Sequence, residues 1–513
     1  MAPYEVTALD VWALTITISA QSLPIWQLGY SAGFASYSVG MGLVGLAYIC
    51  LISCLGELMS AFPFAGGAYG LARCTLGFSV GFLVAICEII EYVVYSATAM
   101  VSFTTIFVCI APDSAGLEPL VWALLYAFSL FVYIRGDRWF WYANFVLALS
   151  CLLVTVVWLL GSLAFLDFAT YAPPPTLVLG GAHGFFRALP SATGFFLGVE
   201  AVSTAADDVQ SPRATIPKGQ GYGMLTLFVT GVLSGVFCGG LPPGIAGIPS
   251  VAATTDSGFM AMFSISEQTA CVLSIPGAIS TAFGFIFAFT KLLTAISKSK
   301  LIPAGFHRQY FIYKTPAVAL ATGILVAYCI CLLVYYVPSV MNHIFNVCCL
   351  SAMTAYSTQC YGYIYVKRHF KHIERRYKSP FGVPGAIFSM AVWSLVILGV
   401  IGFQDDDGIA LCSYVILAGV ALVYYHAYGK HHQSFSDEEK VLFITHVAKF
   451  NAGKRSKPST KKSASAVSSK QSAKTRRSII KVEVRTKSST TGQGSAAGSS
   501  KVAVSAVSES APE

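Results

Sequence analysis

The chain has 513 residues, of which 55% are hydrophobic and only 11% carry a charge, whereas about a quarter of the residues in a typical soluble domain are charged. This composition excludes an ordinary soluble protein and predicts an all-α, polytopic integral membrane protein. The net charge of +9 does not indicate a nucleic-acid partner, because residues 430–513 alone carry a net charge of +10 and the rest of the chain carries −1.

Apolar runs long enough to cross a bilayer recur along the chain and stop near residue 428. A hydrocarbon core of about 30 Å requires about 20 apolar residues in each helix. Only ten residues precede the first run, and they contain Glu5 and Asp10 but no Lys or Arg, so a cleaved signal peptide is not expected. We predict about twelve membrane-spanning helices, near residues 11–34, 38–60, 78–108, 118–134, 141–167, 187–206, 222–240, 271–297, 316–337, 341–366, 384–403 and 408–428.

Basic residues are confined to one of the two sets of connecting loops. That set contains fifteen Lys and Arg residues, from Arg73 to Lys378, whereas the alternate set is acidic and has only Arg187 near its edge. Because cytoplasmic loops carry the excess of Lys and Arg, we predict that both termini are cytoplasmic. We expect the protein to reside in the plasma membrane.

Two of the predicted spans contain residues that disfavour a continuous helix. The first contains residues 20–24 (AQSLP) and the sixth contains residues 196–200 (FLGVE). Pro removes a backbone donor and Gly weakens a helix, and unwound backbone is tolerated at membrane depth only where it is buried in protein or lines a cavity. A proline kink and a packing glycine are the simpler explanation of either break alone. The matched positions of the two breaks favour two five-helix inverted repeats with a binding site between them.

This pattern predicts five regions of the chain. They are a short cytoplasmic N-terminus (1–10), a first five-helix repeat (11–167), a second, inverted repeat (185–366), helices 11 and 12 (384–428) and a basic cytoplasmic tail (430–513). We expect the tail to be disordered, because Ser, Ala, Lys and Thr dominate it and leave too few apolar residues to form a core.

Three blocks of sequence resemble signature regions of the amino acid–polyamine–organocation (APC) permeases. Residues 55–77 (LGELMSAFPFAGGAYGLARCTLG) resemble the segment after that family's second helix, residues 195–218 (FFLGVEAVSTAADDVQSPRATIPK) its sixth helix and residues 282–303 (AFGFIFAFTKLLTAISKSKLIP) its eighth. Residues 88–99 (EIIEYVVYSATA) are similar to the ethanolamine permease branch. The resemblance covers roughly residues 5–430. It implies a five-plus-five inverted-repeat fold of the LeuT type and secondary transport of amino acids or small amines.

Two positions depart from the family pattern. Many members have a glycine-rich break in the first helix, whose free N–H groups bind a substrate carboxylate, but the corresponding segment here, SAQSLP, contains no glycine. Some proton-coupled members have a lysine in the fifth helix, and residues 141–167 contain none. The first departure weakens the case for an α-amino acid substrate, and the second leaves the coupling ion open.

Ionisable residues within membrane spans are functional candidates, because their burial is costly. Glu88 and Glu91 lie one turn apart in the third span, and with Tyr92 and Tyr95 they form a polar and aromatic stripe. Such a stripe suits an ammonium group through ion pairing and cation–π attraction, and interhelical hydrogen bonding is the alternative. Glu200 follows the break in the sixth span, where it is expected to bind an ammonium, carry a coupling proton or cap freed backbone donors.

Other polar residues in the spans have less specific interpretations. Lys291 lies towards the cytoplasmic part of the eighth span, where it either joins an inner gate or extends its ammonium group to the membrane surface. We interpret Glu57 as a solvated helix end. Most of the 14 cysteines are expected to be small apolar packing residues, with a Cys238–Cys271 disulfide across one outer loop as the alternative.

We therefore expect a secondary active transporter that works by alternating access and is coupled to protons. Its substrate is expected to be a small amine such as ethanolamine, or an amino acid; a non-transporting nutrient sensor on a permease fold is the alternative. The sequence shows no nucleotide-binding, metal-binding or catalytic arrangement, so we expect no cofactor and no enzymatic activity. The predicted substrate-binding residues are Ala20, Gln21, Ser22, Glu91, Tyr95, Phe196, Gly198 and Glu200, and the predicted coupling or gating residues are Glu88 and Lys291.

Overall fold

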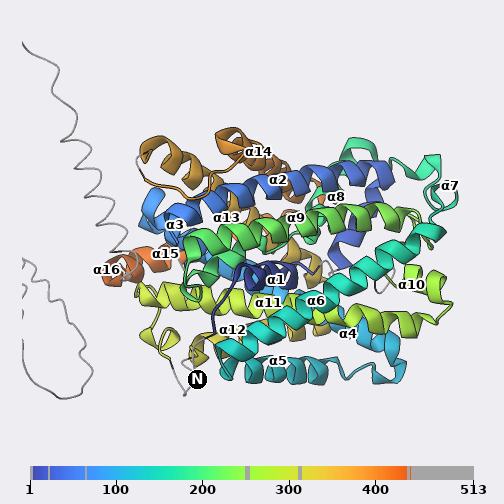
Figure 1. The fold of residues 1–513 in the computed structure, drawn as a ribbon, viewed down its shortest axis with the longest axis horizontal. Helices are drawn as coiled ribbons and strands as arrows, with labels where there is room; N and C mark the ends of the chain where they lie inside the picture. Colours follow the sequence, from blue (N-terminus) through green and yellow to red (C-terminus); the bar gives the residue numbers. More distant parts are fainter. Residues whose placement is uncertain are drawn as a thin grey trace, which may run out of the picture. The chain divides into compact units, whose positions relative to one another are not determined.

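The computed structural model describes residues 4–20, 24–63, 66–248, 253, 255–309, 315–371, 373–435 and 440. The chain divides into two units, Met1–Arg455 and Ser456–Glu513, and every described residue belongs to the first. The predicted disordered tail therefore lies almost entirely outside the described residues. In the part of the chain that is described, the secondary structure consists of helices and contains no β-strand (Figure 1), which confirms the predicted all-α class.

Ten uninterrupted helices coincide with predicted spans. Eight of these ten are long and apolar enough to cross a membrane, α5 is a shorter apolar helix, and α13 is long but less apolar. The ten are α2 (Phe34–Ala61), α4 (Phe78–Ile110), α5 (Glu118–Ile134), α6 (Asp137–Ser162), α9 (Pro212–Gly239), α11 (Glu267–Lys298), α12 (Ala317–Tyr336), α13 (Val340–His369), α14 (Gly382–Phe403) and α15 (Ile409–Tyr424).

Shorter elements connect the spans. They are η2 (Pro112–Ser114), η3 (Leu163–Phe165), α7 (Phe168–Tyr171), η4 (Pro174–Thr176), α10 (Asp256–Phe263), η8 (Ala304–Phe306), η9 (Tyr425–Gly429) and α16 (Lys430–His432). The outward faces of the peripheral helices are strongly apolar: Leu124, Phe128, Leu153 and Val420 are each more than half exposed. Such a surface is unfavourable in water and suits contact with lipid, so the protein is a multi-pass integral membrane protein.

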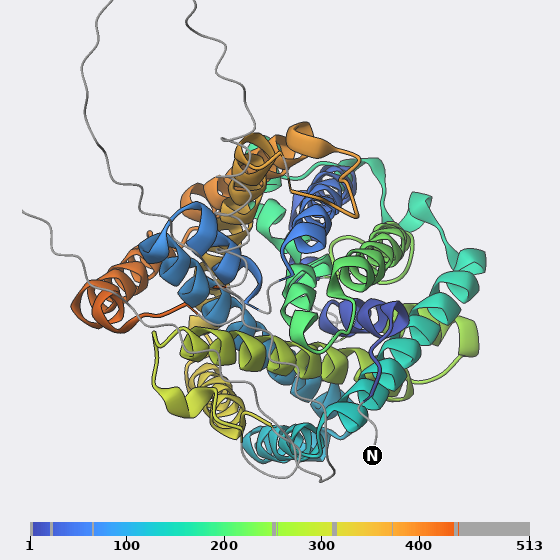
Figure 2. The same cartoon turned by 60° about the vertical axis from the view of Figure 1, so that its left-hand side comes forward.

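The first predicted span consists of two helical pieces. α1 (Ala8–Ile18) begins at a capping box, in which Thr7 and Asp10 satisfy each other's backbone N–H groups. The helix ends at Ile18, with Ser19 as its C-cap, and a 3₁₀ segment, η1 (Pro24–Ala32), begins at Pro24. Residues 21–23 lie outside the described residues. α1 packs against α6, α9 and α11 in the interior of the bundle (Figures 1 and 2).

The sixth predicted span is interrupted at the position that the sequence indicated. α8 (Gly181–Ala192) continues as η5 (Thr193–Phe195), and η6 (Val199–Asp207) begins after Gly198. Gly198 has a φ of +72°, and a Cβ atom at this position would lie 2.4 Å from Phe285 Cε1 and 2.7 Å from Ile18 Cγ2. Both the backbone conformation and the packing therefore require glycine at the break.

A short helix that the sequence analysis did not predict, α3 (Gly67–Thr75), lies between α2 and α4. It begins at Gly67, whose φ is +52° and whose Cβ position would lie 3.2 Å from Ser203 Oγ on η6. The close approach places the N-terminus of α3 against the sixth span. α4 then packs against α3, α11 and α13, so the helix that carries Glu88 and Glu91 is enclosed on several sides.

Candidate substrate site

Three carboxylates that the sequence singled out are buried in the interior of the bundle. Glu88 and Glu91 lie on α4 and are 2% and 0% exposed, and Glu200 lies on η6 and is 1% exposed. Glu200 is close enough to interact electrostatically with both Glu88 and Glu91. The fold thus brings the third and sixth spans together and forms one cluster of three carboxylates.

Hydroxyl and amide donors from α4 and α13 line this cluster. The Tyr356 hydroxyl donates to Glu91 Oε1, and Glu88 Oε1 accepts from Gln359 Nε2 at 3.5 Å and from the Tyr92 hydroxyl at 3.4 Å. The Tyr92 and Tyr356 hydroxyls also adjoin the Glu200 carboxylate. Tyr356 and Gln359 were not among the residues predicted from the sequence, although a glutamine within an apolar span was a visible signal.

Several oxygen atoms of the three carboxylates accept no hydrogen bond from the described residues. Among the described residues, Glu88 Oε2, Glu91 Oε2 and both oxygens of Glu200 have no hydrogen-bond partner, and no Lys, Arg or His side chain described here forms an ion pair with them. An isolated buried carboxylate is strongly unfavourable. The cluster therefore has to be neutralised by protons, by a cationic ligand or by both.

Aromatic rings also lie close to the carboxylates. The Tyr95 ring centroid lies 5.3 Å from that of Phe285, and the Tyr48 centroid lies 5.5 Å from Phe196 and 4.9 Å from Trp393. Within the described residues, the Tyr48 and Tyr95 hydroxyls have no hydrogen-bond partner. Faces of aromatic rings beside carboxylates are a favourable environment for an ammonium group.

The structure places some of the residues predicted at the two breaks near the carboxylates. Gly198 and Phe196 lie next to Glu200 in the sixth span, and the Ser19 hydroxyl donates to the Leu197 carbonyl, so the first and sixth spans contact each other at their breaks. Gln21 and Ser22 lie outside the described residues, and their predicted contact with substrate stays a prediction.

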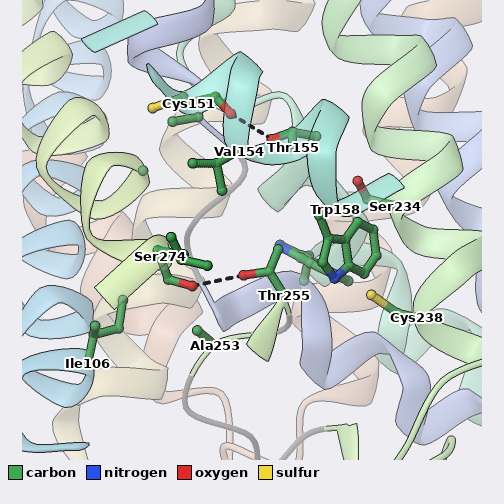
Figure 3. Close-up of a pocket in the computed structure, with 14 residues that line it drawn as sticks. Ile106, Cys151, Val154, Thr155, Trp158, Ser234, Cys238, Ala253, Thr255 and Ser274 are labelled. Atoms are coloured by element: carbon green, nitrogen blue, oxygen red, sulfur yellow. Dashed lines mark hydrogen bonds between the residues drawn. The ribbon is translucent and has the colours of Figure 1, made fainter. Parts of the chain in front are cut away.

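Ala20 lines a separate cavity of about 70 Å³ (Figure 3). The volume is enough for several water molecules, since one water needs about 10–15 Å³. Thr255 and Ser274 face each other across part of the cavity, with their hydroxyl oxygens 2.8 Å apart. The other lining residues include Trp26, Trp158, Ser234 and Cys238.

A buried carboxylate lies beside this cavity, at the start of α10. Asp256 is 1% exposed and accepts hydrogen bonds from Ser274 Oγ and Cys271 Sγ, each at 3.1 Å. Burial raises its pKa to about 6, and the negative charge of Glu267 adds to the shift. Asp256 is therefore a buried carboxylate whose pKa is shifted towards neutral pH, and it lies on a connecting segment and not in a span.

Lys291 forms ion pairs with both of the acidic residues at the end of η6. Its Nζ lies 3.0 Å from Asp207 Oδ1 and forms a closer contact with Asp208 Oδ1, and Lys298 Nζ lies 3.7 Å from Asp207 Oδ2. The ammonium group of Lys291 thus links α11 to the segment that follows Glu200. The predicted gating role of Lys291 stays a prediction.

The interpretation of Glu57 as a solvated helix end is wrong. Glu57 is 1% exposed, and its carboxylate accepts from Lys367 Nζ at 2.6 Å, the Tyr363 hydroxyl at 2.7 Å and the Ser379 N–H at 2.9 Å. Arg375 Nη1 lies 3.2 Å away. The burial is tolerated because two cations from distant segments neutralise the charge.

The alternative of a Cys238–Cys271 disulfide is not supported either, because Cys271 contacts Cys109.

Comparison with known proteins identifies the family. The model of the family described as "Amino acid permease" matches residues 25–435. An uncharacterized transporter of Rhizobium meliloti is 23% identical, with 79% of this chain and 89% of that protein covered. A methylthioribose transporter of Bacillus subtilis is 22% identical over 76% of this chain and 85% of its own length, and a branched-chain amino acid permease of the same organism is 22% identical over 56% and 66%. The protein is thus a membrane transporter, and it belongs to the amino acid permease family of the APC superfamily.

Proposed function

We propose that this permease transports a small amine, such as ethanolamine, or an amino acid, and that it binds the ammonium group of its substrate at the cluster of Glu88, Glu91 and Glu200. One observation carries the proposal: three buried carboxylates lie together without a basic partner among the described residues. A cationic substrate supplies the missing positive charge. The aromatic rings of Tyr95 and Tyr48 add cation–π attraction.

Proton coupling follows from the same cluster. One ammonium group balances one negative charge, so the remaining carboxylates of a buried triad need protons to avoid mutual repulsion. Binding of substrate and of a proton then depend on each other, which is the requirement for coupled movement. All three carboxylates are coupled, because Glu200 interacts with Glu88 and Glu91, and Glu91 also interacts with Glu88.

Alternating access is assigned to the two interrupted spans. In this proposal, the ion pairs of Lys291 with Asp207 and Asp208 close one end of the route next to η6, and the cavity lined by Ala20 and Trp26 lies at the first break. On the predicted orientation, the ion pairs are cytoplasmic and the cavity faces outward.

The alternative of an amino acid substrate is supported by the branched-chain amino acid permease among the relatives.

The test is uptake by protein reconstituted in liposomes, measured with ethanolamine and with alanine at several pH values. Removal of one partner from a buried charge pair costs about 3–5 kcal/mol, so Glu91→Gln and Glu200→Gln are expected to weaken binding of the transported compound by about a hundredfold or more. Glu118→Gln, at the surface end of α5, is the matched control. Normal binding and uptake in both cluster variants would refute the site, and binding without uptake by the wild-type protein would favour a sensor.

A further inference from the structure

Two cysteines that are far apart in the sequence meet at neighbouring ends of α4 and α11. Cys109 is in the last turn of α4, and Cys271, 162 residues later, lies near the start of α11 as its fifth residue. Their Sγ atoms are 2.6 Å apart. That distance is well below the about 3.5–4.0 Å of an ordinary nonbonded contact between carbon-sized atoms, so the two side chains point at each other.

The surroundings of the pair hold the two helix ends in place. Cys271 packs in an apolar cluster with Phe103 and Ile106 of α4 and with Ala278 of α11, and α4 and α11 pack together closely. Both cysteines lie within helices, so the helical backbone fixes the position of each Cα atom. Only a small adjustment is needed to reach the S–S distance of about 2.05 Å in a disulfide.

We infer that Cys109 and Cys271 form a disulfide that joins the ends of α4 and α11. Formation of the bond releases two protons and two electrons from the two thiols. It also removes the S–H that Cys271 donates to Asp256, which then keeps the hydrogen bond from Ser274. The electron acceptor is the exchangeable disulfide of a thiol oxidoreductase, which is itself reduced to two thiols. On the predicted orientation both cysteines lie on the external side, where the environment is oxidising and disulfides persist. The inference is independent of the substrate.

The alternative partner, Cys238, lies elsewhere. Figure 3 shows Cys238 beside Trp158, across the cavity from Ile106 and Ser274. These two residues are one helical turn from Cys109 and Cys271, respectively. The cavity therefore separates Cys238 from the pair.

The bond would join the two helices that support the site from either side. α4 carries Glu88 and Glu91, and Phe285 of α11 packs on the rings of Tyr92 and Tyr95. A crosslink at their ends keeps these helices as one unit while the interrupted spans change conformation. Because it closes a long loop, it also restricts the unfolded chain and raises stability.

The experiment is peptide mapping of the full-length protein, with free thiols blocked by N-ethylmaleimide before the cells are broken. We expect a nonreduced digest to contain one peptide pair linked through Cys109 and Cys271, and we expect reduction to separate the pair. Recovery of both cysteines as blocked free thiols would overturn the inference. So would a linked pair that contains Cys238 and Cys271.

A stability measurement supplies a second readout. Cys109→Ser is expected to lose the linked peptide and to lower the Tm by several degrees in the absence of reductant. The matched control is Cys412→Ser, because Cys412 is an exposed cysteine on α15, and its Tm should equal that of the wild type. Equal Tm values for Cys109→Ser and the wild type would argue against the bond. If Cys109→Ser does not fold, the peptide map of the wild-type protein still decides the question.

Discussion

The Tyr356 hydroxyl donates a hydrogen bond to the Glu91 carboxylate, across 265 residues of sequence. The contact joins α13 to α4, and both side chains are fully buried. Tyr356 also packs its ring 5.6 Å from Tyr48 and 5.6 Å from Trp393, measured between centroids. A residue from the tenth span thus orients a carboxylate of the third span inside the proposed substrate site.

Tyr356→Phe keeps the ring packing and removes the donor. A hydrogen bond to a charged group contributes about 1.5–3 kcal/mol, so we expect the affinity for the transported compound to fall by about tenfold to a hundredfold. Tyr361→Phe is the control, because Tyr361 lies on the same helix but is 47% exposed. Binding of radiolabelled substrate to purified protein measures both variants, and equal affinities would remove Tyr356 from the site.

Gly198→Ala tests the break in the sixth span. The variant needs an alanine at a φ of +72° and within 2.4 Å of Phe285, and left-handed backbone and overpacking each cost about 1–3 kcal/mol. We expect a lower Tm and loss of uptake. Gly221→Ala, which has no neighbouring atom within 4 Å of its Cβ position, should keep wild-type values. Normal uptake by the Gly198 variant would show that the break is not needed.

Lys291→Met tests the proposed inner gate. The change removes a cation that contacts both Asp207 and Asp208, so the segment after Glu200 is expected to open more readily towards the cytoplasm. A reporter cysteine, Ser203→Cys on η6, should then react several-fold faster with a water-soluble thiol reagent added from that side. Lys298→Met is the matched control, since Lys298 is farther from Asp207, at 3.7 Å, and should change the rate less. An unchanged rate in the Lys291 variant would contradict the gate.

Asp256 predicts a specific pH dependence of stability. Its folded-state pKa of about 6 lies above the unfolded value of 3.8, so the folded protein binds more protons than the unfolded chain between these values. The contribution of Asp256 to stability therefore decreases as the pH rises from about 4 to about 6, by about 1.4 kcal/mol for each unit of pKa difference. Asp256→Asn should flatten the dependence of Tm on pH in this range, whereas Glu118→Gln should not. An unchanged slope in Asp256→Asn would exclude Asp256 as the source.

The sequence by itself determined the features that follow from local composition. Hydropathy placed the spans, because each helix has to be apolar over the thickness of the bilayer wherever its neighbours lie. Gly198 marked the break in the sixth span, because a positive φ is a property of the backbone at one position. Glu88, Glu91 and Glu200 were recognisable as candidates, since a carboxylate within an apolar run is costly in any arrangement.

Only the tertiary structure decided which of these residues meet. The sequence does not specify that Tyr356 faces Glu91, that Lys291 pairs with Asp207, or that Cys271 lies against Cys109 and not near Cys238. Glu57 shows the reason most clearly: its helix end looks solvated in the sequence, and it is buried because Lys367 and Arg375 arrive from segments more than 300 residues away. Such contacts depend on how helices pack against one another, and helix packing is not encoded in the hydropathy or periodicity of any single segment.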